Sequence, residues 1–188
     1  MLDPKSEILS ALYNRLDDQA QRLADAASEL TIWEAAALGR LDAIDRLLGS
    51  DPSRVNAPGA DGNFPLGLAA FFGKVDAMQR LLDRGAEVAA TAQNFMKVQP
   101  LHAAVAARSA GAVALLLERG ADVNARQQVG YTPLMGAASG GREDLADMLM
   151  RNGADPSAVG EDGKTAADIA REHGHEVLAA RLAGPSGP

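Results

Sequence analysis

The sequence contains no cysteine, which excludes disulfide bonds, thiolate metal sites and a cysteine nucleophile. The absence of disulfides fits a reducing compartment, and we expect a cytoplasmic protein. No run of about 18 apolar residues is present, so no membrane-spanning helix is expected. The start of the chain, residues 1–7, is polar and lacks the apolar segment of a signal peptide.

Aromatic residues are also scarce, at 4% of the chain, although hydrophobic residues reach 47%. The core must therefore be built mainly from Ala, Leu and Val, and small side chains of this kind let helices approach closely. The net charge is −7, which disfavours binding to nucleic acid and promotes solubility. The abundance of Ala, Gly and Arg is typical of a GC-rich bacterial genome.

What the sequence does contain is an internal repeat. The segment 81–88, LLDRGAEV, recurs as LLERGADV at 116–123 and as LMRNGADP at 149–156. The glycines of these segments, Gly85, Gly120 and Gly153, are spaced by 35 and 33 residues. A Pro-Leu pair precedes each Gly-Ala pair by 20 residues, at 65, 100 and 133. The chain is therefore a short array of similar units.

Each unit predicts a pair of helices. Pro65 suits the first turn of a helix, where no backbone N–H is needed. An Ala-rich stretch follows, and Gly73 can end it in a left-handed conformation. A second helix then carries apolar residues at helical spacing from Val75 to Leu82, and Gly85 ends it in the same way.

The array resembles the ankyrin repeat family, most closely in Thr132-Pro133-Leu134, in PLHAA at 100–104 and in GADVNA at 120–125. The resemblance implies an all-α solenoid of about five helix-turn-helix units joined by short hairpin turns. It covers residues 31–182, divided as 31–58, 59–91, 92–126, 127–159 and 160–182. The first and last units act as caps.

Two segments lie outside the repeats. Residues 1–30 carry apolar residues three or four apart after an Asp3-Pro4 helix start, which indicates one amphipathic helix, or two with a break near Asp17-Asp18. We interpret this segment as a cap over the first repeat, with Trp33 as core filler beneath it. A dimerisation arm is the alternative. We expect residues 183–188 to form a flexible tail.

The third unit departs from the pattern in two places. The link from Gly85 to Pro100 is two residues longer than the link from Gly120 to Pro133 and carries Lys97 where a turn glycine is expected. Arg108 stands at the helix-ending position of Gly73. A residue other than glycine costs on the order of 1 kcal/mol in a left-handed conformation, unless the helix ends differently there.

No motif predicts catalysis, a metal site or a cofactor. The stretch GEDGKT at 160–165 has two residues between its glycines where a phosphate-binding loop needs about four. His102 belongs to the repeat pattern, and the resemblance implies a structural hydrogen bond for it. His173 and His175 lack a nearby third metal ligand, and Ser139 has no adjacent His or Asp in the sequence.

The resemblance implies a concave groove that binds another protein, formed by the hairpins and the first helix of each unit. The groove positions are Phe71, Phe72, Phe95, Met96, Lys97, Val98, Arg108, Arg126, Gln128, Val129 and Tyr131. Clustered exposed apolar residues mark interaction sites, and the basic residues among them favour an acidic partner segment with an apolar anchor. Phe71 and Phe72 could instead pack between repeats.

We expect a monomeric protein-binding module, acting as a regulator or inhibitor of one partner. A structural subunit docked through the N-terminal helix is the alternative. Neither expectation involves nucleic acid or a membrane.

Overall fold

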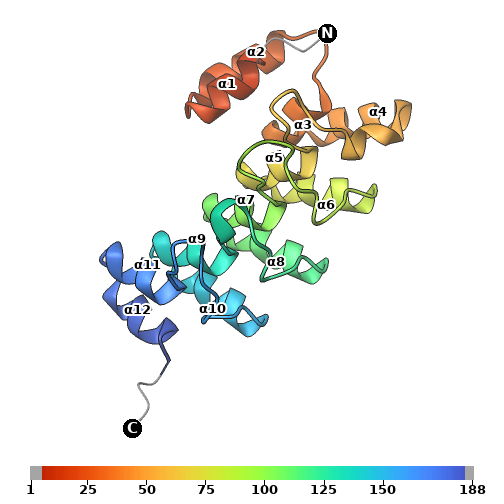
Figure 1. Ribbon diagram of the computed structural model, residues 1–188. Coiled ribbons are helices and arrows are strands. Elements are labelled where there is room, and N and C mark those ends of the chain that lie inside the picture. Colours follow the sequence, from red (N-terminus) through yellow and green to blue (C-terminus); the bar gives the residue numbers. More distant parts are fainter. Residues whose placement is uncertain (1–5, 185–188) are drawn as a thin grey trace.

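The computed structural model describes residues 6–184, in which helices are joined by turns and hairpins and no strand occurs. Pairs of helices are stacked in single file from the N-terminal to the C-terminal end (Figure 1). This arrangement is the helical repeat solenoid expected from the sequence. The expected helix start at Asp3-Pro4 and most of the expected tail lie outside the described residues.

Each repeat contributes one inner and one outer helix, and the two kinds form separate rows (Figure 1). The inner helices are α3 (Ile32–Leu38), α5 (Pro65–Phe71), α7 (Pro100–Ala106), α9 (Pro133–Ser139) and α11 (Ala166–Glu172). The outer helices are α4 (Leu41–Ser50), α6 (Val75–Asp83), α8 (Ala110–Glu118), α10 (Glu143–Arg151) and α12 (Glu176–Leu182). Each inner helix packs on the inner helices of the adjacent repeats, as in a nearest-neighbour array.

The inner helices begin as the sequence predicts. Pro65, Pro100 and Pro133 each occupy the first helical position. The first and last inner helices begin instead with a capping threonine: Thr31 and Thr165 accept backbone N–H groups three residues ahead, within reciprocal capping boxes. The phosphate-loop-like stretch at 160–165 is therefore a turn followed by a helix start.

The inner helices end in left-handed residues. Gly39, Gly73, Gly141 and Gly174 have φ angles between 63° and 78°. Arg108 takes the same conformation, with φ 56°, so α7 ends like the others without a glycine. Of the two alternatives, a left-handed Arg108 or a helix that ends differently, the structure has the first. The left-handed conformation of this arginine lowers the stability of the fold locally.

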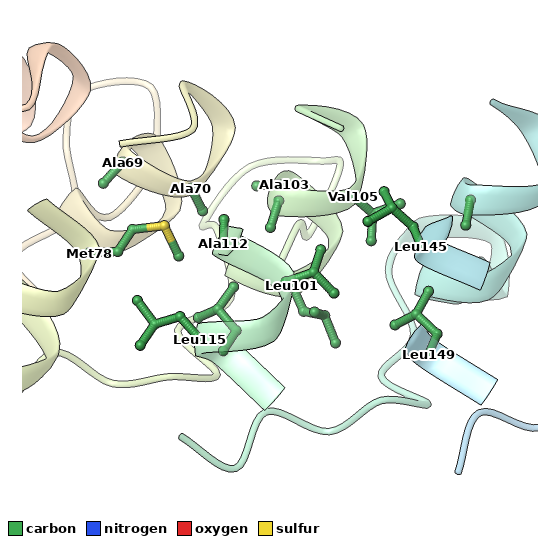
Figure 2. Close-up of a cluster of buried hydrophobic side chains, with 14 of the residues drawn as sticks. Ala69, Ala70, Met78, Leu101, Ala103, Val105, Ala112, Leu115, Leu145 and Leu149 are labelled. Carbon is green, nitrogen blue, oxygen red and sulfur yellow. The ribbon is translucent and has the colours of Figure 1, made fainter. Parts of the chain in front are cut away.

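The core is a continuous layer of small and aliphatic side chains between the two rows. It includes Ala69, Ala70 and Ala103 of the inner helices and Met78, Leu145 and Leu149 of the outer helices, which follow one another along the array (Figure 2). Most of these side chains are fully buried. Alanines on the inner helices explain how neighbouring repeats come close with so few aromatic residues.

On the solvent side, the outer helices are joined by ion pairs in which the acid belongs to the earlier repeat and the arginine to the later one. The pairs are Asp45 with Arg80 and Arg84, Asp83 with Arg119, and Glu143 and Asp147 with Arg181. All of these side chains are at least a quarter exposed, so each pair contributes little to stability.

The N-terminal segment forms two short helices, α1 (Glu7–Tyr13) and α2 (Asp17–Ala26). The chain breaks between them at Arg15, whose φ is 58°, so the two-helix alternative is the one observed. Ser6 caps α1 through the Leu9 N–H. The short helices η1 (Pro52–Asn56) and η2 (Gln128–Gly130) complete the described chain.

Candidate functional site

A cavity of about 290 Å³ opens on the inner side of the array, between α5 and α9. Its walls include Phe71, Met96, Val98 and Tyr131, four of the residues that the sequence places in a groove. The other lining residues are His102, Ala103, Val105, Ala106, Gln127, Thr132, Pro133, Gly136 and Ser139. The cavity therefore lies at the junction of the second, third and fourth repeats, with mainly apolar walls.

The hairpin before α7 reaches this cavity with a longer tip than the other hairpins have. The tips at 59–63, 127–131 and 160–164 each close with a backbone hydrogen bond between residues four apart. The tip at 92–98 closes between the Ala92 N–H and the Val98 carbonyl, six residues apart, at 2.9 Å. The two extra residues thus fall within the tip itself, where the side chain of Phe95 is 75% exposed.

Two of these tips contain a left-handed residue other than glycine. Lys97 has φ 49° and takes the place of the turn glycine, so the backbone at this position is left-handed without one. Val129 has φ 58° and is followed by Gly130 with φ 72°. A β-branched residue is rare in this region of the backbone, and such strain is typical of functional segments. Val129 is also exposed, as its assignment to the groove requires.

Two of the expected groove residues hold the tips together. The Arg126 guanidinium donates to the carbonyl oxygens of Gly130, at 3.3 Å, and Val159, at 2.8 Å. The Gln128 N–H donates to the Met96 carbonyl oxygen at 3.2 Å. The side chains of Arg126 and Gln128 are both exposed, but the guanidinium of Arg126 already donates hydrogen bonds within the chain.

Lys97 and Arg108 provide the positive charge of the groove. Both are exposed, and neither has an acidic side chain within 4 Å among residues 6–184. On the outer face, by contrast, Arg80, Arg119 and Arg181 are paired with acids of the preceding repeat. Two of the expected groove residues are therefore unpaired cations.

His102 has a structural role, as the resemblance implies. Its Nε2 lies 3.2 Å from the carbonyl oxygen of Tyr131 and so donates to it, which ties α7 to the next hairpin tip. Burial lowers the pKa of His102 and raises that of the Tyr131 hydroxyl, because both charged forms lose solvation. Both groups therefore stay neutral near pH 7.

One polar pair was missed at the sequence level. Ser139 Oγ lies 3.5 Å from Nε2 of His173, whose Nδ1 lies 2.9 Å from the carbonyl oxygen of Ile169. Because a carbonyl only accepts, Nδ1 carries the proton and Nε2 accepts from the serine. Ser139 is the last residue of α9, where the negative end of the helix dipole opposes an oxyanion. The pair is thus better suited to hydrogen bonding at the groove end than to nucleophilic catalysis.

The remaining expected site residue, Phe72, lies half-buried beneath the N-terminal helices. Its ring packs against Phe71 and against Tyr13 of α1, with centroids 5.1 and 5.3 Å apart. Trp33 is also half-buried, and its Nε1 donates to the Ala57 carbonyl oxygen at 2.9 Å. Phe72 therefore contacts the chain's own N-terminal segment.

No cluster of three or more His, Cys, Asp or Glu side chains that could hold a metal occurs within residues 6–184. None of the helices between these limits is long and apolar enough to span a membrane.

Comparisons with known proteins agree with the geometry. A family model described as ankyrin repeats (3 copies) matches residues 32–127, and one described as ankyrin repeats (many copies) matches residues 116–170. Neurogenic locus notch homolog protein 2 of Homo sapiens is 43% identical over 106 residues, which are 56% of this chain and 4% of that protein. Neurogenic locus notch homolog protein 1 of Xenopus laevis is 38% identical over 124 residues, 65% of this chain and 5% of that protein.

The chain thus spans about a twentieth of the length of these relatives, and the similarity concerns their repeats alone. Both relatives are animal proteins and give no support to the bacterial origin expected from composition. Ankyrin repeat proteins are generally interaction modules without enzymatic activity. With half of its residues matched by the first model and the helix pairs of that repeat in its fold, this chain belongs to the ankyrin repeat family.

Proposed function

We propose that the chain binds a segment of another protein whose apolar anchor enters the cavity and whose acidic residues lie beside it. The observation that carries this proposal is the coincidence of an apolar cavity, a protruding Phe95 and the unpaired cations Lys97 and Arg108 on one face. Large exposed apolar side chains ringed by polar ones are the usual form of an interface hot spot.

The size and position of the cavity support a protein ligand. A volume of about 290 Å³ lies at the lower limit of the ~300–1,000 Å³ of small-molecule sites, so an inserted side chain suits it better than a cofactor does. The exposed tip at 92–98 extends the apolar surface beyond the cavity. A partner segment can thus anchor in the cavity and continue over the tip.

The positive charges of the groove indicate that the partner segment is acidic. Opposite charges speed association and fix the register of a bound segment, and their contribution falls as salt rises. The chain as a whole is acidic, so an acidic segment is attracted to the cations of the groove and repelled elsewhere. The biological role we propose is that of a monomeric cytoplasmic regulator or inhibitor of one partner.

The test begins with affinity capture from the native cytoplasm, followed by titration of the captured partner. Phe95→Ala and Tyr131→Ala are each expected to weaken binding by roughly 1–3 kcal/mol, as for anchors in a hot spot, with unchanged melting temperatures. Met150→Ala removes an exposed apolar side chain from the outer helix α10 and is the matched control. Equal affinities for all three variants would reject the groove as the binding site.

A second role follows from the exposed apolar residues of the N-terminal segment. Tyr13 and Leu16 are 44% and 49% exposed, which suits a subunit that docks into a larger assembly through this end. Leu16→Ser then abolishes co-purification with the assembly, whereas a groove-binding module keeps its partner. The same pull-down therefore discriminates the two roles.

A further inference from the structure

The inner face of the second repeat differs from the same face of the third and fourth repeats. Its helix α5 presents Leu68, Phe71 and Phe72. The positions in register with these three residues carry Ala103, Ala106 and Ala107 in the third repeat and Gly136, Ser139 and Gly140 in the fourth. The second repeat therefore carries bulky apolar side chains where the third and fourth repeats carry small ones.

The N-terminal helices lie on these bulky side chains. Ile8, Ala11 and Leu12 of α1 are buried in one cluster with Ala37 of α3 and Leu68 of α5. Tyr13 adds its ring at 5.7 Å from Phe71. An additional stacked repeat would contact only its immediate neighbour. Because α1 reaches residues of two repeats, it lies across the inner face and is more than an end cap.

The polar attachments of α1 are few. Ser6 donates to Glu34 at 2.6 Å, and the Tyr13 hydroxyl has only long contacts of 3.4 Å to Asp61 and Asn63. One exposed ion pair, between Asp25 and Arg40, connects α2 to the repeats. The Tyr13 contacts and the ion pair are exposed and contribute little to the free energy that holds the segment in place, which leaves the part-buried Ser6–Glu34 bond as the main polar attachment.

The apolar contact of α1 is also incomplete. A cavity of about 490 Å³ lies between α1 and the hairpin that precedes α5, and its walls include Leu9, Tyr13, Trp33 and Ala60. A seven-residue helix is too short to be stable alone, so its order depends on this partial contact. The residues from 27 to 31 that join α2 to α3 are exposed or half-buried.

From these observations we propose that the pair α1–α2 is a displaceable internal ligand of the inner face. In the structure it covers Leu68 and Phe72, next to the cavity proposed for the partner, and its release lengthens the apolar groove by one repeat. The occupant of this surface is an amphipathic helix with an aromatic anchor, supplied by the chain itself. The inference rests on the proposed function only where it concerns the partner, because the displacement can be measured without one.

The absence of cysteine makes single thiol reporters unambiguous. Ala36 and Ala37 are adjacent in α3 and both fully buried, but Ala36 faces the repeats whereas Ala37 faces α1 and α2. The experiment measures how fast Ala36→Cys and Ala37→Cys, each in the full chain, react with Ellman's reagent under native conditions. Fraying of α3 as a whole would expose both thiols, whereas release of α1–α2 exposes only the second.

The expected result is that Ala37→Cys reacts on the order of 100-fold faster than Ala36→Cys, because local opening costs less than unfolding of a repeat. Adding Tyr13→Ala is expected to raise the rate for Ala37→Cys several-fold and leave the other rate unchanged. Equal rates, or rates that follow global unfolding in urea, would overturn the inference and make α1–α2 a fixed cap.

Amide hydrogen exchange on the unmodified chain gives the same answer if a cysteine variant fails to fold. The amides of α1 should then exchange much faster than those of α5, and similar protection of both helices would contradict the inference. Neither measurement depends on a partner. Failure of the groove to bind a partner would therefore contradict the proposed function alone, whereas a fixed N-terminal segment would contradict this inference alone.

Discussion

The hairpin tip at 92–98 and the three shorter tips all connect one repeat to the next, but they differ in length and in the residues at the turn. The shorter tips close over five residues, and those at 59–63 and 160–164 turn at Gly62 and Gly163. The longer tip closes over seven, turns at Lys97 and exposes Phe95. A tip lies outside the core, so its length and side chains can change while the stack of helices stays the same.

Adjacent tips are joined by backbone hydrogen bonds, which do not depend on the side chains, and also by the side chains of Asn94 and Arg126. The Gly62 carbonyl accepts from the Gln93 N–H at 2.8 Å, and the Met96 carbonyl accepts from the Gln128 N–H at 3.2 Å. The longer tip therefore keeps a bond to the tip on each side of it. Its unusual residues are free to serve a purpose other than folding.

The largest effect is expected where a tip glycine touches its neighbour. A Cβ at Gly62 would lie 2.8 Å from the backbone of Gln93, in addition to the cost of a left-handed alanine. Gly62→Ala should lower the free energy of unfolding by about 2–4 kcal/mol, measured in urea. Gly163, with φ 75° and no atom near its would-be Cβ, is the control, and Gly163→Ala should cost only about 1 kcal/mol. Equal losses would mean that contact between tips is unimportant.

The next effect concerns the length of the long tip. Deleting Phe95 and Met96 gives it the five-residue length of the other tips. The free energy of unfolding should change by less than about 1 kcal/mol, because small changes in loop length cost little. Affinity for a captured partner should fall at least tenfold, about 1.4 kcal/mol or more, since two apolar contacts are lost. A deletion variant that binds at full strength would show that the extra length has no role in recognition.

A smaller effect is expected at the left-handed lysine. Lys97→Gly removes the cost of a side chain at φ 49° and should stabilise the fold by about 1 kcal/mol. Lys97→Ala keeps that cost and removes only the charge, so it should leave stability nearly unchanged. If both substitutions raise the urea midpoint equally, charge rather than backbone strain sets the stability of this tip.

The smallest effect is a dependence on pH at the tip that follows. The folded-state pKa of His102 is lowered by burial, so the unfolded chain binds the proton first as the pH falls. The contribution of neutral His102 to the free energy of unfolding is complete above the pKa of the unfolded chain, near 6.5, and declines as the pH falls below that pKa. His102→Gln should therefore lose less stability between pH 7 and pH 5 than the parent, in urea unfolding at each pH. A parallel decline in both proteins would assign the pH dependence to other groups.

The repeat period made most of the fold predictable from the sequence. Proline and glycine at fixed spacing gave the starts and ends of the inner helices, and the same register placed Phe71, Met96, Val98 and Tyr131 around one cavity. Register also held a signal that was not used: residues one repeat apart lie side by side, which brings His173 to Ser139, 34 positions earlier.

The position of α1 could not be predicted in this way. Its segment lies outside the repeats, so periodicity says nothing about which helix it contacts. The pertinent signal was the contrast between Leu68 or Phe71 and the small residues at the same positions of the third and fourth repeats. Bulky apolar residues on an inner face require a cover, and here the cover comes from the same chain.

The ion pairs of the outer face have a consequence for how the array responds to ionic strength. Three of the four outer seams carry such a pair, whereas α8 and α10 have none between them in the described chain, since Met148 and Asn152 stand at the positions in register with Arg80 and Arg84. Salt screens exposed charges and leaves apolar contacts largely intact. Raising the salt concentration therefore weakens the first, second and fourth seams slightly and spares the third, so the four seams differ in their response to the electrolyte.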